Sequence, residues 1–224
     1  LQTAVYGLTE HYRPKVKEAQ LVACPGCYPT ATLLCLLPLV GGALIKSDPI
    51  IIDAKSGVSG AGRGLKEGNL FCEVAEGLHP YGIGVHRHTP EIEQELSLAG
   101  SGPLQVTFTP HLVPMTRGEL VTCYVALNGC TVGDVHADLS AAYEGEAFVN
   151  VRALGDMPPD TRHVRGTNRC EISVHADRVV GRAIIVGAID NLIKGSAGQA
   201  LQNANLMFGF EEGKGLSQLK PLFP

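Results

Sequence analysis

The hydrophobic and polar positions of the first half of the chain predict short strands alternating with helices. Residues 19–24 form an apolar run that predicts a short buried strand, and residues 25–40 continue as an apolar helix beginning near Pro29, because proline suits the first turn. Residues 48–55 are rich in β-branched side chains and predict a second strand. It ends in a loop at 57–64, where four of the eight residues are glycine and regular structure is not expected.

The second half of the chain is richer in strand patterns. It follows a helix that starts at Thr89, the expected cap, with Pro90 in its first position. One further helix is predicted at 132–145, and a hairpin turns around Asp177. The predicted strands are 106–109, 120–127, 148–151, 171–174 and 179–189. We therefore expect an α+β protein with an extended mixed or antiparallel sheet and flanking helices.

The last helix is predicted to start at Asp190 and Asn191. A spacing of three and four residues places its apolar side chains on one face. These side chains are Ile193, Ala197, Ala200, Leu201, Ala204 and Phe208.

Composition and charge exclude several classes of partner. The 224 residues are 45% hydrophobic and 18% charged, with a net charge of −4, as in ordinary globular proteins. Without a run of Lys and Arg, neither nucleic acid nor an anionic membrane surface is an expected partner. The longest apolar stretch, residues 33–45, is interrupted by Pro38 and is shorter than the ~20 residues that span a bilayer.

The ends of the chain and its cysteines bear on its compartment. No signal peptide pattern is visible at the N-terminus, and seven cysteines do not form a tight disulfide framework. We expect a cytoplasmic protein, or one of an organelle stroma if a transit peptide has been removed. Because the chain starts with Leu1, we expect a processed protein or an excised piece.

Cys27 is the first candidate catalytic residue. It follows a predicted strand and precedes a helix, whose free N–H groups and dipole stabilise a thiolate. A buried apolar cysteine is the alternative. Cys24 adds a Cys-x-x-Cys pair, so a redox dithiol is a second interpretation. A zinc site is not expected, because a second such pair or a histidine pair at helical spacing is missing from the sequence.

His86 and His88 are the candidate partners of a nucleophilic thiol. They are two residues apart, so in an extended segment both side chains point to the same side. An imidazole near the thiol would hold an ion pair and later move protons. Spacing does not show this contact, and surface or capping histidines remain the alternative.

Three other polar features are weaker signals. The glycine-rich loop with Arg63 could hold an anion through backbone N–H groups, although a flexible turn has the same composition. Arg117 stands at the start of a predicted strand, where its guanidinium suits a carboxylate or a phosphate. Asn191 lies at a helix start and is equally typical of a cap.

Five segments together resemble the N-acetyl-γ-glutamyl-phosphate reductases of arginine biosynthesis, within the semialdehyde dehydrogenase group. In chain order they read PGCYPT, SGVSGAGR, HRHTPEI, TPHLVPMTRG and DNLIKGSAGQA. The resemblance covers essentially the whole chain and implies a fold like the catalytic domain of glyceraldehyde-3-phosphate dehydrogenase. It also implies NADPH-dependent reductive dephosphorylation of N-acetyl-L-glutamyl 5-phosphate to the semialdehyde through a cysteine thioester, without a metal.

The same resemblance assigns roles by motif. Cys27 is the implied nucleophile and His86 the acid/base, with His88 a close second candidate. The implied substrate and phosphate pocket is lined by Ser56, Arg63, His88 and Arg117. The implied contacts with the nicotinamide end of NADP are Ser59, Gly60 and Asn191. A homodimer or homotetramer is the implied assembly.

The resemblance also implies a domain division, because the family has an N-terminal Rossmann domain whose glycine fingerprint does not occur here. Residues 1–24 are expected to be the remnant of that domain and 25–189 the catalytic and dimerisation domain. Residues 190–224 are expected to be a helix and tail that pack against the missing half. We therefore expect residues 1–224 alone to bind NADPH poorly.

Three other functions remain open at this point. A thiol-disulfide oxidoreductase would use Cys24 and Cys27. A non-catalytic dimerisation fragment would assemble without any unusual reactivity of Cys27. A Cys–His hydrolase would need an oxyanion site, which the helix start after Cys27 could supply.

Overall fold

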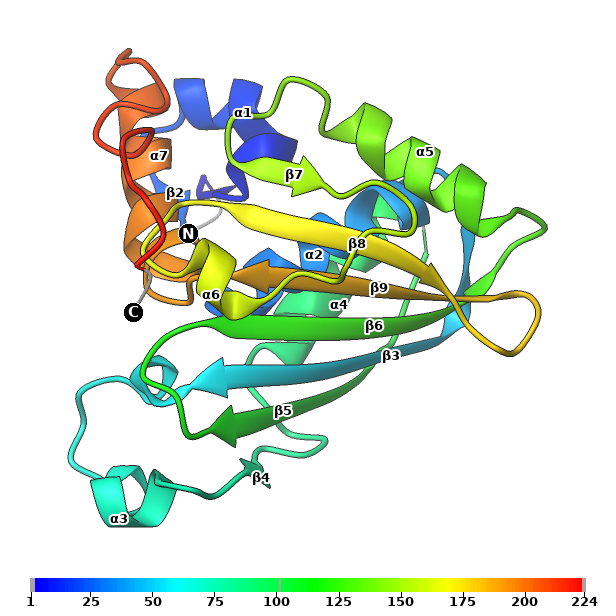
Figure 1. Ribbon diagram of the computed structural model, residues 1–224. Helices are drawn as coiled ribbons and strands as arrows, with labels where there is room; N and C mark the ends of the chain where they lie inside the picture. The colour runs from blue at the N-terminus through cyan, green and yellow to red at the C-terminus, as the bar shows by residue number, and fades with distance from the viewer. Residues whose placement is uncertain (1–2, 101, 223–224) are drawn as a thin grey trace.

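The chain folds around a seven-stranded mixed sheet. The computed structural model describes residues 3–100 and 102–222, and Figure 1 shows their arrangement. The strands lie in the order β4-β5-β3-β6-β9-β8-β7. Their bounds are β3 Ile45–Gly57, β4 His79–Pro80, β5 Thr107–Val113, β6 Glu119–Leu127, β7 Val149–Val151, β8 Cys170–Ala176 and β9 Arg182–Ile189. β3 runs parallel to β5 and antiparallel to β6, while β8 and β9 form the predicted hairpin. The α+β prediction is confirmed.

Helices α2 (Cys27–Gly41), α4 (Thr89–Ala99) and α5 (Val132–Ala142) pack on one face of the sheet (Figure 1). α2 is apolar on all sides because it lies in the middle of this layer, where its leucines are fully buried. The strand residues beneath it, such as Val121 and Ile185, are also buried. Removal of this apolar surface from water is the main stabilising contribution.

The opposite face of the sheet is open in the part of the chain that the structure describes. Ile51 of β3 and Tyr124 of β6 lie on it with 41% and 38% of their surface exposed. The short helix α6 (Thr161–Val164) lies beside β9 near one end of this face (Figure 1). None of the described helices combines the length and the apolar character needed to cross a bilayer.

The two ends of the chain pack against each other. β1 (Val5–Tyr6) pairs in parallel with β2 (Val22–Ala23), and α1 (Thr9–Glu18), which joins them, packs on α7 (Gly198–Met207). Figure 1 shows α1 and α7 as neighbours at one end of the molecule.

Helix α7 buries its polar face in this chain. Gln199, Gln202 and Asn203 are buried against the N-terminal segment, whereas Leu201 and Phe208 are 42% and 73% exposed. Buried polar side chains are stable when they are hydrogen-bonded. Here Gln199 and Asn203 both donate to the backbone oxygen of Gly7 at 2.8 Å. The apolar face of this helix is therefore largely exposed in the described part of the chain, and hydrogen bonds to distant residues bury the polar side instead.

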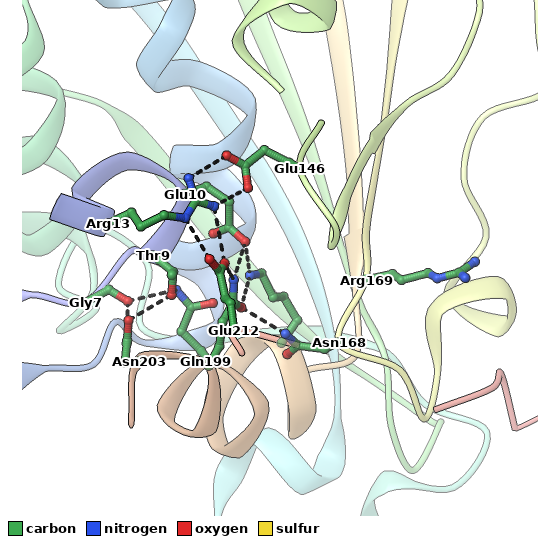
Figure 2. A network of polar contacts seen from close by, with 12 residues as sticks. Gly7, Thr9, Glu10, Arg13, Glu146, Asn168, Arg169, Gln199, Asn203 and Glu212 are labelled. Carbon is green, nitrogen blue, oxygen red and sulfur yellow. Dashed lines mark hydrogen bonds and ion pairs between the residues drawn. The ribbon is translucent and has the colours of Figure 1, made fainter. Parts of the chain in front are cut away.

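An ion-pair network extends this contact, and Figure 2 shows it from close by. Lys194 Nζ lies 2.6 Å from Glu10 Oε1, and both side chains are completely buried. Nearby, Arg13 donates to the carboxylates of Glu146 and Glu212. Gln202 joins the two groups by donating to Glu10 and Glu212.

Some predicted element boundaries need correction. The strand near residue 22 has two residues and is not buried, since Val22 is half-buried and Ala23 is exposed. α2 begins at Cys27, two residues before Pro29. The cap position of α4 is His88 rather than Thr89, and no side chain caps it by a hydrogen bond. The glycine-rich loop contains a 3₁₀ turn at Val58–Ala61, and the last helical segment starts with a π-helical turn at Ile193–Ala197.

Candidate active site

A cavity of about 850 Å³ opens where α2 begins. Its walls come from the start of α2, the loop after β3, the segment before α4 and the turn after β9. The predicted site residues on its walls are Cys27, Ser56, Ser59, Gly60, His86, His88 and Asn191. Four segments that are distant in sequence thus converge on one cavity.

Cys27 occupies the first position of α2. The preceding Gly26 is extended, and its N–H donates to the Glu91 carboxylate at 3.1 Å. The hydroxyl of Thr30 donates to the Gly26 carbonyl at 2.9 Å. A methyl group on Gly195 would lie 2.6 Å from the Cβ of Cys27. The cysteine is therefore held between a fixed helix start and a position that only glycine fits.

The pKa of the Cys27 thiol is shifted in the direction opposite to that expected at a helix N-terminus. Burial raises the pKa of the Cys27 thiol well above its usual value, and the neighbouring Glu119 carboxyl raises it further. Backbone N–H groups of Tyr28 and Cys27 lower this pKa, but by less. The position at a helix N-terminus predicts a lowered pKa for the thiol. This prediction is wrong for this structure, because burial raises the pKa by more than the helix N-terminus lowers it.

The two histidines lie together beside this helix start. Their ring centroids are 4.8 Å apart, and the ring of His88 packs on Gly26, where a methyl group would lie 2.4 Å from its Nε2. Nδ1 of His86 accepts a hydrogen bond from the His88 backbone N–H at 3.2 Å, so the neutral His86 ring carries its proton on Nε2. Burial lowers the pKa of both rings, that of His88 to about 4, and Arg87 adds to the effect.

The first backbone N–H groups of the loop after β3 are bonded to the segment that connects β5 and β6. The N–H groups of Val58 and Ser59 donate to Met115 and Thr116 oxygens at 2.9 and 3.2 Å. Asn191 is not a helix cap: it accepts from the Gly118 N–H at 2.8 Å and donates to Ser59 Oγ at 2.9 Å. Asn191 thus ties this loop to the start of β6.

The structure does not bring Arg63 and Arg117 to the walls of this cavity. Arg63 lies on a neighbouring surface hollow, and Arg117 pairs with the fully buried Asp190 at 2.8 Å. The Asp190 carboxylate also accepts from the Leu192 and Ile193 N–H groups, as a helix cap does. The cationic side chains that do line the cavity are Lys66 and Arg87.

Cys24 and Cys27 have different surroundings. All seven cysteines are free. Cys24 is exposed, and Asn203 Nδ2 lies 3.8 Å from its sulfur, whereas Cys27 packs against Gly195. The extended Gly26 between them has φ −67° and ψ 164°. No observation here favours the dithiol interpretation.

Sequence reasoning missed three residues around Cys27: Glu91, Gly195 and Glu119. Glu119 had a detectable signal, since it shares the inward parity of β6 with Val121 and Cys123. A carboxylate on the apolar side of a strand is unusual and marks a position for inspection.

Among the described residues, three carboxylates are placed closely enough to hold a metal ion: Glu10, Glu146 and Glu212. Arg13 already pairs with two of them. This cluster belongs to the network of Figure 2 and lies outside the cavity described above.

The family described as semialdehyde dehydrogenase, dimerisation domain, matches residues 27–191. A Rhodospirillum rubrum protein named N-acetyl-γ-glutamyl-phosphate reductase is 59% identical over 222 residues, which are 99% of this chain and 62% of that protein. A relative from Oryza sativa subsp. japonica, whose name includes the same enzyme and the word chloroplastic, is 55% identical over 224 residues, or 100% of this chain and 54% of the relative.

Solved structures share the fold. Aspartate semialdehyde dehydrogenase II from Vibrio cholerae, complexed with ASA, matches with a TM-score of 0.72 and 18% sequence identity. The match covers 93% of this chain and 69% of that one. The chain spans less than two thirds of the two relatives' lengths, 62% and 54%.

Proposed function

We propose that this chain, which belongs to the semialdehyde dehydrogenase family, is the catalytic part of an N-acetyl-γ-glutamyl-phosphate reductase. Relatives with that name, 59% and 55% identical over the aligned residues, support this proposal. The observation that carries it is the placement of Cys27 at a helix start on the cavity that His86 and His88 also line. The proposed reaction is the reductive dephosphorylation of N-acetyl-L-glutamyl 5-phosphate to the semialdehyde.

In this proposal Cys27 attacks the acyl carbon of the substrate. The S–H bond breaks, a C–S bond forms, and the bond to the phosphate oxygen breaks, so that inorganic phosphate leaves and a thioester remains. Lys66 and Arg87 are the cations on the cavity wall that favour a departing phosphate. Ser56 contributes a hydroxyl to the same wall.

An imidazole handles the protons. We assign this role to His86, with His88 as the second candidate because its ring packs on Gly26. Both rings are neutral at pH 7, since their pKa values are lowered. A neutral imidazole can accept the thiol proton and, once the thioester has been reduced, return a proton to the Cys27 sulfur as the C–S bond breaks and the semialdehyde leaves. Arg63 and Arg117 remain candidates for substrate binding, and the observed contacts give them no direct support.

NADP is the proposed cofactor, and no metal is proposed. When bound, NADPH supplies the hydride that reduces the thioester. Ser59, Gly60 and Asn191 would hold its nicotinamide end, and the local geometry fits this role: a methyl group on Gly60 would lie 2.7 Å from Ser56 Oγ, so this part of the wall must remain bare backbone. Asn191 keeps the loop in place through Ser59 and Gly118.

The proposed domain division remains as expected from the sequence. Residues 1–24 would belong to the dinucleotide-binding domain, 25–189 to the catalytic and dimerisation domain, and 190–224 to a segment that packs against the former. The contact of α1 with α7 supports the packing of the last segment on the first. A homodimer or homotetramer in the cytoplasm or an organelle stroma is proposed, supported by the family's description and the open sheet face.

The acylation step tests this function with the chain alone. We expect N-acetylglutamyl phosphate to acylate Cys27 and release one phosphate, as measured by intact-protein and peptide mass spectrometry with a phosphate assay. Cys27→Ser is expected to abolish the thioester. Cys24→Ser is the matched control, because its exposed thiol should be dispensable. Acylation of another residue, or none in a folded chain, would reject the proposal.

A further inference from the structure

A fully buried carboxyl group lies beside the proposed nucleophile. Glu119 is the first residue of β6 and is 0% exposed. In the sheet it pairs with Ser56 of β3 and Ile189 of β9. Its side chain has the same parity as the core residues Val121 and Cys123 and therefore points toward the helical layer, where Cys27 begins α2.

The Glu119 carboxyl lacks the partners that normally accompany a buried acid. Among the described residues, neither oxygen has a hydrogen-bond partner at normal distance and angle, and the Cys27 thiol is the side chain close enough to act as a donor to this carboxyl. The group is nevertheless near enough to Cys27 that each shifts the other's titration. Buried carboxyl groups without a cation or donor are rare and costly. A structural role would be served better by an apolar side chain, so the position calls for a chemical explanation.

Two acids in one apolar environment cannot both ionise easily, because their negative charges repel each other at low dielectric. A charge on Glu119 therefore favours the protonated thiol, and a thiolate on Cys27 requires Glu119 to be protonated. The pair carries at most one negative charge near neutral pH.

We propose that Glu119 is a positioning residue of the reaction, whose buried carboxyl, once ionised, keeps the proton on Cys27 and so limits the nucleophile in alkaline solution. The inference rests on the proposed function for its relevance to catalysis. The effect of the Glu119 carboxyl on the Cys27 thiol is independent of substrate and cofactor.

The neighbouring groups leave Glu119 as the group that titrates between pH 7 and 10. Burial raises the pKa of Glu119 to about 8. His86 and His88 face the same site with lowered pKa values and are neutral in this range. Tyr28, Tyr81 and Cys170 are also near, and burial raises the pKa of each.

The test is the pH profile of Cys27 alkylation by iodoacetamide, followed by peptide mass spectrometry from pH 6 to 10. In the wild-type chain, the rate is expected to rise up to about pH 8 and then to level off. In Glu119→Gln the alkylation rate should continue to rise about tenfold per pH unit. The variant should therefore react about tenfold faster than the wild-type chain at pH 9 and at nearly the same rate below pH 7. A merely structural role would not remove the plateau selectively.

Further variants keep the test decisive. Glu119→Met should behave like Glu119→Gln, and it replaces the latter if the buried amide prevents folding. Glu119→Asp should restore the plateau. Glu95→Gln is the matched control, because Glu95 of α4 is only 2% exposed and is bonded to Tyr12 rather than to Cys27. Its profile should equal the wild-type profile.

The outcomes separate the two proposals. If Glu119→Gln alkylates more slowly than wild type above pH 8, the carboxylate assists ionisation instead of opposing it, and the inference is wrong. If both profiles coincide in folded proteins, Glu119 has no influence and the inference also fails. If the profiles differ as expected but acyl phosphate never acylates Cys27, the proposed function fails while the control of the thiol by Glu119 stands.

Discussion

Lys194 and Glu10 form an ion pair with 2.6 Å between Nζ and Oε1, although 184 residues separate them and neither side chain reaches solvent. Burial alone would raise the pKa of Glu10, but attraction to Lys194, together with hydrogen bonds from Lys194 and Gln202, outweighs this effect and the pKa is lowered. The pair joins the N-terminal helix α1 to the turn before α7.

Breaking this pair should therefore destabilise the fold strongly. Lys194→Met leaves the Glu10 carboxylate buried without a cation, which costs about 3–5 kcal/mol of unfolding free energy. The double variant Glu10→Gln/Lys194→Met should recover most of that loss. Urea unfolding at pH 7 measures both. The exposed pair of Arg162 and Asp160 is the control, and Arg162→Met should change the unfolding free energy little, because water screens this pair. Equal losses in the two single variants would contradict this prediction.

Glu119 should make the fold less stable as pH rises. Its folded pKa of about 8 lies above the ordinary value of 4.5, so the unfolded chain binds fewer protons between these pH values. The unfolding free energy then falls with a slope of up to about 1.4 kcal/mol per pH unit and becomes level above pH 8. Glu119→Met should remove this slope and raise Tm at pH 9. Thermal unfolding monitored by circular dichroism at pH 5, 7 and 9 tests it, and an unchanged slope in the variant would refute it.

His88 should act in the opposite direction in acid. Its folded pKa of about 4 lies below the ordinary 6.5, mainly because of burial. Below pH 6.5 the unfolded chain takes up a proton that the folded chain does not, so stability falls as pH decreases from 6.5 toward 4. His88→Asn should weaken this acid loss. His175, which is half-buried on the open sheet face and bonded to Ser173, provides the comparison variant His175→Asn, and a larger effect there would count against His88.

The two histidines can be distinguished by function. If His86 carries the acid/base role, His86→Asn should reduce release of phosphate from N-acetylglutamyl phosphate by ~10²–10⁴-fold. His88→Asn should then reduce it less and mainly alter substrate affinity, because the His88 ring packs on Gly26. A single-turnover phosphate assay measures both variants. The reverse order of effects would transfer the role to His88.

Gly195 should be intolerant of any side chain. A methyl group there would lie 2.6 Å from Cys27 Cβ and 3.1 Å from Ile189 Cδ1, so Gly195→Ala must displace the start of α2. We expect at least a tenfold loss of Cys27 acylation by acyl phosphate. Gly64→Ala is the control, since a methyl group at Gly64 meets no atom within 4 Å and acylation should remain unchanged. Normal acylation in Gly195→Ala would show that this packing is not required.

The sequence by itself determined the local elements and the identity of the motifs. Alternating side chains predicted β6 and the hairpin of β8 and β9, and the strand-to-helix transition placed Cys27 at the start of α2 within two residues. These features follow from periodicities and turn residues that act over a few positions.

Only the tertiary structure decided the surroundings of these elements. It turned the polar face of α7 inward, paired Arg117 with Asp190, and buried Cys27 next to Glu119, so that burial first and the carboxyl second raise the thiol pKa. The physical reason is common to all three: burial and charge depend on residues that are far apart in sequence, and their effects at short range in a low-dielectric interior exceed those of local propensity or a helix dipole.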